Sequence, residues 1–414
     1  WRNIRESGNT RMPRGLTGLY LTKQEEAALN GEKGEAVKIA MEVIVKVGEA
    51  LGAERLIEIN HAHISGISYN NIGEPGLQFI ENIRSKGARF TVPTTINPIG
   101  VDLEDPAGIP GATREFIMKQ KQVIDNLAAM GAKPVMTCTP YYVDEVKPGW
   151  HLAWGESSAV AYANTYIGAW TNREGGPLAL MAAIAGRTYY AGVHIPENRI
   201  PRTVFTVHGY TNDQAVASVI GSIVARETKY KQPMIEGVEG IREPEIKTMC
   251  AAAGAAGNLE MCVIPGITKV DTSKTAIEEK VDIEQNDLEA ELDQYRPTER
   301  PDVVFIGCPH VGIEELEEAA KLAISHGGQA RNHFWIATSR NVYNKALQLG
   351  LVEKLRERNI RVLRDTCIVV SPGWRETGYT VATNSYKTMF YLKRIHGLKA
   401  YMAPLRELID LSLR

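Results

Sequence analysis

Three cysteines each end a short apolar run and could together bind a metal. Cys138 lies in Thr-Cys-Thr-Pro, Cys308 in Gly-Cys-Pro-His and Cys367 in Asp-Thr-Cys. Ligands of open parallel sheets gather at the carboxyl ends of the strands, and thiolates bind iron–sulfur clusters and zinc. Three thiolates on a four-iron cube would leave one iron free to bind a substrate. Because no Cys-x-x-Cys pair is present, the spacing alone leaves three unrelated buried thiols as an equal alternative.

Zinc is the second metal that these residues could bind. His310 follows Cys308 by two residues and could complete a site of three cysteines and one histidine. A structural zinc site more often has clustered ligand pairs than thiols on three distant strands, so the iron–sulfur interpretation ranks first. The remaining cysteines, Cys250 and Cys262, lie among small and apolar residues, which is typical of packed thiols.

Several polar segments also follow predicted strands. In the segment 61–69, His61 and His63 are most simply polar residues of a strand-to-loop turn, whereas the glycine and serines could offer N–H and hydroxyl groups to an anion. The segment 94–98 is similar. Glu156-Ser157-Ser158 lacks the Gly-x-Ser-x-Gly elbow of hydrolases. Lys387 lies near a predicted helix start, where a cation suits a phosphate or carboxylate, although a surface lysine is the simpler interpretation.

Alternating strands and helices would bring these residues together. Apolar patterning predicts strands at 56–60, 90–92, 134–136, 303–306, 334–337 and 360–363. It predicts helices at 35–52, 77–86, 114–130, 313–324, 342–358 and 388–395. Since strands and helices alternate, parallel sheets with right-handed crossovers are expected.

The chain divides into several expected domains. These are an N-terminal extension at 1–16, an α/β domain with Cys138 at 17–145, a Gly/Ala-rich middle domain at 146–267, a charged linker or helix at 268–300, and an α/β domain with Cys308 and Cys367 at 301–414. Small residues in the middle domain permit close helix packing.

Composition excludes several classes of protein. The formal net charge of −2 argues against broad binding of nucleic acid or anionic membranes. No apolar run is long enough for a membrane span, and the first residues lack the apolar core of a secretory signal. Five cysteines in 414 residues do not make a disulfide framework. We therefore expect a cytoplasmic protein. No Gly-x-Gly-x-x-Gly segment follows a predicted strand, so the sequence does not indicate a dinucleotide cofactor.

Taken together, these segments resemble the large, catalytic subunit of the aconitase X family, from about Gly18 to the C-terminus. The resemblance is carried by Ala62–Tyr69, Val92–Pro98, Cys138–Tyr141, Trp154–Ala159, Gly307–His310 and Asp365–Cys367. It implies an aconitase-like α/β fold of several three-layer parallel-sheet domains with helices on both faces. The arrangement is most similar to the archaeal branch, which removes water from (R)-5-phosphomevalonate to give trans-anhydromevalonate 5-phosphate in a mevalonate pathway.

The resemblance also implies a site. An iron–sulfur cluster of the 4Fe–4S type would be held by Cys138, Cys308 and Cys367. A small anionic hydroxy acid would be bound by Gly66, Ile67, Ser68, Asn97, Pro98, Ser157, Ser158 and Lys387. In aconitase-like enzymes a small swivelling domain supplies the serine taken as the base. We therefore expect the catalytic base on a separate small subunit, and no activity from this chain alone.

Other functions remain open at this point. The bacterial branch of the family includes cis-3-hydroxy-L-proline dehydratases, whose substrate also carries a carboxylate and a leaving hydroxyl. A zinc-supported or metal-free scaffold, and an iron-responsive binding protein, are alternatives of a different class. The near-neutral charge counts against an iron-responsive protein that binds RNA.

Overall fold

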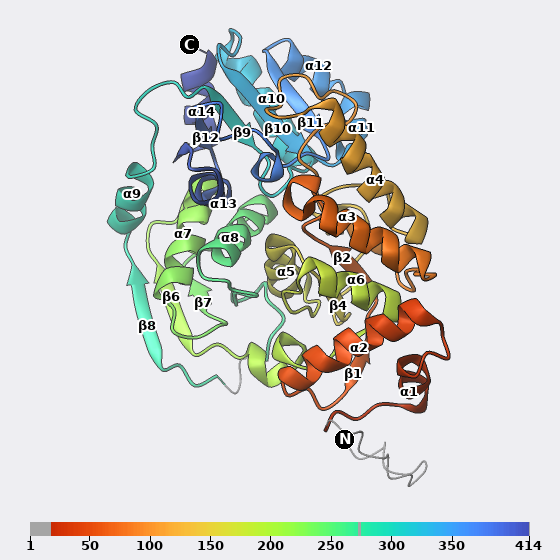
Figure 1. The fold of residues 1–414 in the computed structure, drawn as a ribbon. Coiled ribbons are helices and arrows are strands. Elements are labelled where there is room, and N and C mark those ends of the chain that lie inside the picture. Colours follow the sequence, from red (N-terminus) through yellow and green to blue (C-terminus); the bar gives the residue numbers. More distant parts are fainter. Residues whose placement is uncertain (1–17, 272–274, 414) are drawn as a thin grey trace.

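The computed structural model describes residues 18–271 and 275–413, so the N-terminal extension expected at 1–16 lies outside the described residues. Figure 1 shows helices packed around several sheets, with the C-terminal sheet at one end of the molecule and helix α1 near the other. The described strands form four sheets, three of which are parallel. This confirms the expected α/β class with parallel sheets flanked by helices. No helix in the described ranges is long and apolar enough to cross a membrane.

The N-terminal part is built on the sheet β3-β2-β4, and a separate antiparallel pair joins β1 to β5. The strands are β1 (Leu56–Glu58), β2 (His61–Ile64), β3 (Thr94–Ile96), β4 (Leu152–Trp154) and β5 (Arg187–Tyr189). The helices are α1 (Lys23–Leu29), α2 (Glu35–Ala50), α3 (Tyr69–Ser85), α4 (Arg114–Met130) and α6 (Gly176–Ala185). The α4 bounds match the sequence prediction, because Thr113 caps its start and Gly131 ends it in a left-handed conformation.

Three strands of this part differ from the prediction. The strand expected at 134–136 does not form, and only Met136 makes an isolated bridge, to Ile96. The strand expected at 56–60 ends at Glu58, and His61 and His63 lie within β2 rather than after a strand. The strand expected at 90–92 forms instead at 94–96, where it pairs with β2. The backbone N–H groups of Phe90 and Thr91 donate to carbonyls of α4 and α6, so these residues are not available to the sheet.

The C-terminal part is one parallel sheet with the order β11-β10-β9-β12-β13. Its strands are β9 (Val303–Ile306), β10 (His333–Thr338), β11 (Ile360–Arg364), β12 (Thr380–Thr383) and β13 (Lys399–Met402). Its helices are α10 (Ile313–His326), α11 (Arg340–Gln348), α12 (Leu351–Arg356), α13 (Tyr386–Tyr391) and α14 (Leu405–Leu413). The single helix expected at 342–358 is interrupted by Gly350, whose φ of 70° is left-handed.

The middle part packs helices against the parallel sheet β7-β6-β8. Its elements are α5 (Ser157–Tyr162), β6 (Thr203–Val207), α7 (Gln214–Glu227), β7 (Met234–Glu236), α8 (Glu243–Ala256), β8 (Glu279–Ile283) and α9 (Gln285–Asp293). Helices α7 and α8 pack closely at Gly221. A Cβ at this position would stand 2.2 Å from the Met249 carbonyl oxygen, so the contact needs glycine. The charged segment 268–300 contributes β8 and α9. The domain limits expected from the sequence stay a prediction.

A buried ion pair joins the three parts of the chain. Lys247 on α8 is fully buried and pairs with Glu315 in the first turn of α10. Its ammonium also donates to the His310 carbonyl at 3.1 Å and to the Tyr142 hydroxyl at 3.4 Å. Since a charge removed from water needs partners that satisfy it, this lysine constrains how the three parts dock.

We expect Lys247→Met to lower the free energy of unfolding by about 3–5 kcal/mol, because it leaves the Glu315 carboxylate buried without its cation. Chemical denaturation of the purified chain measures this change. Lys280→Met, at an exposed position of β8, is the matched control and should shift stability by no more than about 0.5 kcal/mol. Equal effects of the two substitutions would contradict the structural role of Lys247.

Candidate active site

One pocket of about 220 Å³ collects the residues that the sequence singled out. All three cysteines of interest line it. Of the other predicted site residues, Gly66, Ile67, Ser68, Asn97, Pro98, Ser157 and Lys387 also line it. Ser158 does not line the pocket, but its hydroxyl lies 3.4 Å from the Lys387 ammonium. Residues up to about 320 positions apart in the sequence thus meet at one place, as expected for strand ends in parallel sheets.

The three cysteines are held by backbone contacts beside strand ends. Cys138 follows Thr137, whose N–H donates to the Ile96 carbonyl at 2.9 Å. Cys308 follows β9 and Gly307, where a Cβ would stand 2.5 Å from the Ala337 carbonyl oxygen. The N–H of Cys367 donates to the Ile99 carbonyl at 2.9 Å. Cys308 therefore closely follows a strand, whereas Cys138 and Cys367 lie in loop segments that backbone hydrogen bonds hold beside Ile96 and Ile99.

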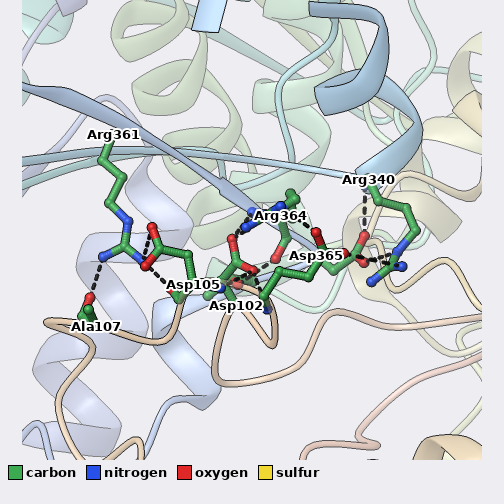
Figure 2. A network of polar contacts seen from close by, with 9 residues as sticks. Asp102, Asp105, Ala107, Arg340, Arg361, Arg364 and Asp365 are labelled. Atoms are coloured by element: carbon green, nitrogen blue, oxygen red, sulfur yellow. Dashed lines mark hydrogen bonds and ion pairs between the residues drawn. The ribbon is translucent and has the colours of Figure 1, made fainter. Parts of the chain in front are cut away.

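The polar network of Figure 2 holds the segment before Cys367 against the N-terminal part. The buried Asp102 carboxylate accepts from the backbone N–H and the Nε of Arg364, each at 3.0 Å. Asp365 accepts from the backbone N–H of Arg340 at 2.8 Å and also binds its guanidinium. Arg361 at the start of β11 pairs with Asp105. Ionic contacts therefore reinforce the backbone pairing between these two parts of the chain.

Burial dominates the chemistry of the unliganded thiols. It raises the pKa of Cys367 to about 12 and raises the pKa values of Cys138 and Cys308 above their usual range. Without a cation these groups stay protonated near neutral pH. A metal that binds them has to displace their protons, since the thiolate is the ligand.

No group of three or more His, Cys, Asp or Glu side chains within 18–271 and 275–413 is placed to hold a single metal ion. His310 is not a free ligand, because both of its ring nitrogens have protein partners, Thr137 Oγ1 at 3.0 Å and the Thr366 carbonyl at 2.9 Å. The three-cysteine, one-histidine zinc site that the sequence left open would require one of these bonds to break, since a histidine binds a metal through one ring nitrogen.

The side chains of both histidines of β2 have protein partners, but they lie in a strand and not in the strand-to-loop turn that the sequence predicted. His61 lies 3.1 Å from Asp144 and accepts from the Trp154 indole at 3.0 Å. His63 bonds to Thr95 and, at 2.8 Å, to Asn97. Burial lowers the pKa of His63 to about 4, so its ring is neutral and orients the Asn97 amide.

A buried ion pair between Glu156 and Lys387 is the main charged feature of the pocket. Burial alone would raise the pKa of Glu156, but Lys387 and hydrogen bonds, including one from Asn97 at 2.8 Å, hold it below its usual range. Burial would lower the pKa of Lys387, but the Glu156 carboxylate raises it. Both groups are therefore charged at neutral pH.

Sequence reasoning missed part of this arrangement. It noted Glu156 within a polar segment but did not place it in the site, and Glu156 and Arg173 both line the pocket. The position of Glu156 at the N-cap of α5, where it accepts from the Ser158 N–H, was the available signal. Lys387 is buried in the first turn of α13 and is not a surface lysine.

Glu174 lies next to Arg173, behind the pocket, and is 2% exposed. Its carboxylate accepts from the Tyr189 hydroxyl at 2.8 Å and from Thr188 at 3.2 Å. Burial raises its pKa to about 7, and these hydrogen bonds only partly offset the effect. Glu174 therefore titrates near neutral pH, unlike Glu156.

Together, the parallel sheets and the shared pocket define an α/β protein that presents thiols and a buried ion pair at its strand ends. Models of the aconitase X first, second and third domains match residues 18–197, 201–293 and 301–414. The chain belongs to the aconitase X family. It is 45% identical over 402 residues to the phosphomevalonate dehydratase large subunit of Aeropyrum pernix, covering 94% of this chain and 99% of that relative.

Two further comparisons agree with this family. The crystal structure of Thermococcus kodakaraensis aconitase X in its holo-form superimposes with a TM-score of 0.86 and 36% identity, covering 95% of this chain and 100% of that one. The chain is also 32% identical over 423 residues to the cis-3-hydroxy-L-proline dehydratase of Pseudomonas aeruginosa, covering 96% of this chain and 70% of that relative.

The titration of Glu174 should be visible in stability. Its folded pKa exceeds the ordinary value of 4.5, so its contribution is complete below about pH 4.5 and is lost as pH rises through about 7. Relative to Glu174→Gln, the natural chain should lose about 3 kcal/mol of unfolding free energy between about pH 4.5 and pH 8. Unfolding curves across this range measure the difference. Glu236→Gln, at an exposed carboxylate on β7, is the control, and parallel curves for the natural chain and Glu174→Gln would refute the assignment.

Proposed function

We propose that this chain is the large subunit of an archaeal-type phosphomevalonate dehydratase, a hydro-lyase that converts (R)-5-phosphomevalonate to trans-anhydromevalonate 5-phosphate in a mevalonate pathway for isoprenoid synthesis. The observation that carries the proposal is the 45% identity to the Aeropyrum pernix large subunit over 99% of its length. Several archaeal relatives share that name at 33–37% identity. The hydroxyproline dehydratase of Pseudomonas aeruginosa is a longer protein, of which this chain covers 70%.

The cofactor proposed for this subunit is an iron–sulfur cluster of the 4Fe–4S type, held by Cys138, Cys308 and Cys367. The donor set supports it, because three thiols from separate segments of the chain line one pocket and thiolates are the ligands of such clusters. When bound, the cluster supplies a Lewis acid for the leaving hydroxyl group of the substrate.

The protein groups around the cysteines would bind and orient the substrate. We propose that contacts come from Gly66, Ile67, Ser68, Asn97, Pro98, Ser157, Ser158 and Lys387, which lie in or beside the pocket. Phosphomevalonate carries a carboxylate and a phosphate. The pocket offers two cations, Lys387 and Arg173, of which Lys387 is paired with Glu156. The buried Lys387 would fix one anionic end, and the backbone N–H groups around Ser68 would stabilise charge that develops on the carboxylate.

The base that removes the proton next to the substrate carboxylate is proposed to come from a small subunit. Glu156 is the one carboxylate among the described residues that line the pocket, but its lowered pKa makes it a weak base near neutral pH. The activity would therefore need both subunits, in agreement with the large-subunit names of the relatives. We propose a cytoplasmic location, because the five described cysteines are free and a cluster needs reduced thiols.

The cofactor proposal predicts a specific cysteine pattern. The two-subunit complex, purified without oxygen, should be brown and contain iron and sulfide, and Cys308→Ser should lose both because one of three attachment points is removed. Cys250→Ser, at a buried thiol on α8 outside the pocket, should keep them. Elemental analysis and the visible spectrum provide the measurement. A protein that is fully active without iron, or that contains zinc in its place, would contradict the proposal.

The substrate proposal is tested by assaying the reconstituted complex on both family substrates. We expect dehydration of (R)-5-phosphomevalonate and at least about a hundredfold lower kcat/KM for cis-3-hydroxy-L-proline. A site that pairs a buried cation with the phosphate of the substrate rejects a ligand that lacks this phosphate. Product formation is followed by mass spectrometry, with either subunit alone as the control. A preference for hydroxyproline would contradict the proposed substrate but would agree with the proposed reaction class.

A further inference from the structure

We propose that His310 is a positioning residue that holds the three cysteine segments in register before any cofactor binds. The inference deepens the proposed function, because it concerns how the same pocket is assembled. His310 is fully buried and follows Cys308 by two residues. Through its ring and its backbone it contacts the segments of both other cysteines.

The ring of His310 bridges two residues that each precede a cysteine. Its Nε2 lies 2.9 Å from the Thr366 carbonyl, and its Nδ1 lies 3.0 Å from Thr137 Oγ1. A carbonyl oxygen only accepts, so Nε2 carries the proton and donates it. Nδ1 then accepts from the Thr137 hydroxyl. Thr137 and Thr366 immediately precede Cys138 and Cys367, so one imidazole fixes the separation of their segments.

The backbone of His310 makes two further contacts of the same kind. Its N–H donates to Cys138 Sγ at 3.1 Å, and its carbonyl accepts from Lys247 Nζ at 3.1 Å. The His310 N–H thus contacts one thiol directly. The bond from Lys247 connects His310 to helix α8 of the middle part. Because Thr137 Oγ1 also accepts from the Thr139 N–H at 3.1 Å, the hydroxyl that meets the ring is itself oriented.

These contacts separate a positioning role from two alternatives. A metal ligand would need a ring nitrogen free, and both are used. If His310 only filled the core, either replacement would loosen the cysteines around it without regard to which hydrogen bond was lost. A positioning residue should instead affect each pocket cysteine through the bond that joins its segment to the ring.

Two conservative substitutions cut the two ring bonds one at a time. In His310→Gln, the amide nitrogen takes the place of Nε2 and can still donate to the Thr366 carbonyl, but nothing accepts from Thr137. In His310→Asn, the amide oxygen takes the place of Nδ1 and can still accept from Thr137, but nothing reaches Thr366. The backbone contacts stay in both variants, so either should fold even where alanine does not.

The readout is the alkylation rate of each cysteine in the full-length, cofactor-free chain, mapped by mass spectrometry. His310→Gln should label Cys138 about tenfold faster than the natural chain, and His310→Asn should label Cys367 about tenfold faster, as expected for local opening when one hydrogen bond is lost. Cys250 and Cys262, which are buried outside the pocket, should keep their rates and serve as internal controls.

His194→Gln, a change at a buried histidine that pairs with His151, controls for the loss of a core imidazole and should leave Cys138 and Cys367 unchanged. Equal acceleration of Cys138 and Cys367 in both His310 variants, or acceleration of neither, would overturn the positioning role. The experiment needs no cofactor, so the labelling pattern can hold even if the chain proves to bind no cluster. Failure of the cluster proposal and failure of this inference are therefore distinguishable.

Discussion

The constraint on which the structure depends is the meeting of three cysteine segments at one pocket. Main-chain bonds tie the segment of Cys367 to Ile99 in the N-terminal part, which also contains Cys138. These bonds work only if the N-terminal and C-terminal parts are docked correctly. The docking is secured by buried charges, Lys247 with Glu315 on one side and Asp102 with Arg364 on another. The pocket is thus a property of the assembled chain, and none of its parts could form it alone.

Buried charge performs two different tasks around this pocket. Lys247 and Glu315 have their donors and acceptors filled by protein groups, which suits a pair whose task is to hold parts together. Glu156 and Lys387 instead border open space, so an anionic ligand that enters can compete for the ammonium. The same type of ion pair is therefore enclosed by protein groups in one place and borders a pocket in the other. The difference lies in what surrounds the pair.

Local signals in the sequence were sufficient for some elements and not for others. Helix α4 could be predicted to the residue because Thr113 and Gly131 mark both ends. The strand expected at 90–92 moved to 94–96, because pairing with β2 outweighs local apolar character. Strand β8 alternates charged and apolar residues at the edge of its sheet, a pattern that within 268–300 indicated only a linker or helix. The three pocket cysteines could be recognised in the sequence. Lys387, the partner of Glu156, lies 231 residues away, and no local pattern predicts their pairing.

The thiols also explain why the surrounding scaffold has to be rigid. Burial raises the pKa values of these thiols, so binding the proposed cluster would mean losing protons and gaining charge in a buried place. That charge is tolerable only where donors already face it. The His310 N–H beside Cys138 and the Lys387 ammonium at the pocket wall are such donors, and neither has to be brought in from solvent. A scaffold that holds these donors in place would stabilise the negative charge of thiolates as soon as the proposed cofactor binds. This gives a physical reason for the many hydrogen bonds around the three cysteines.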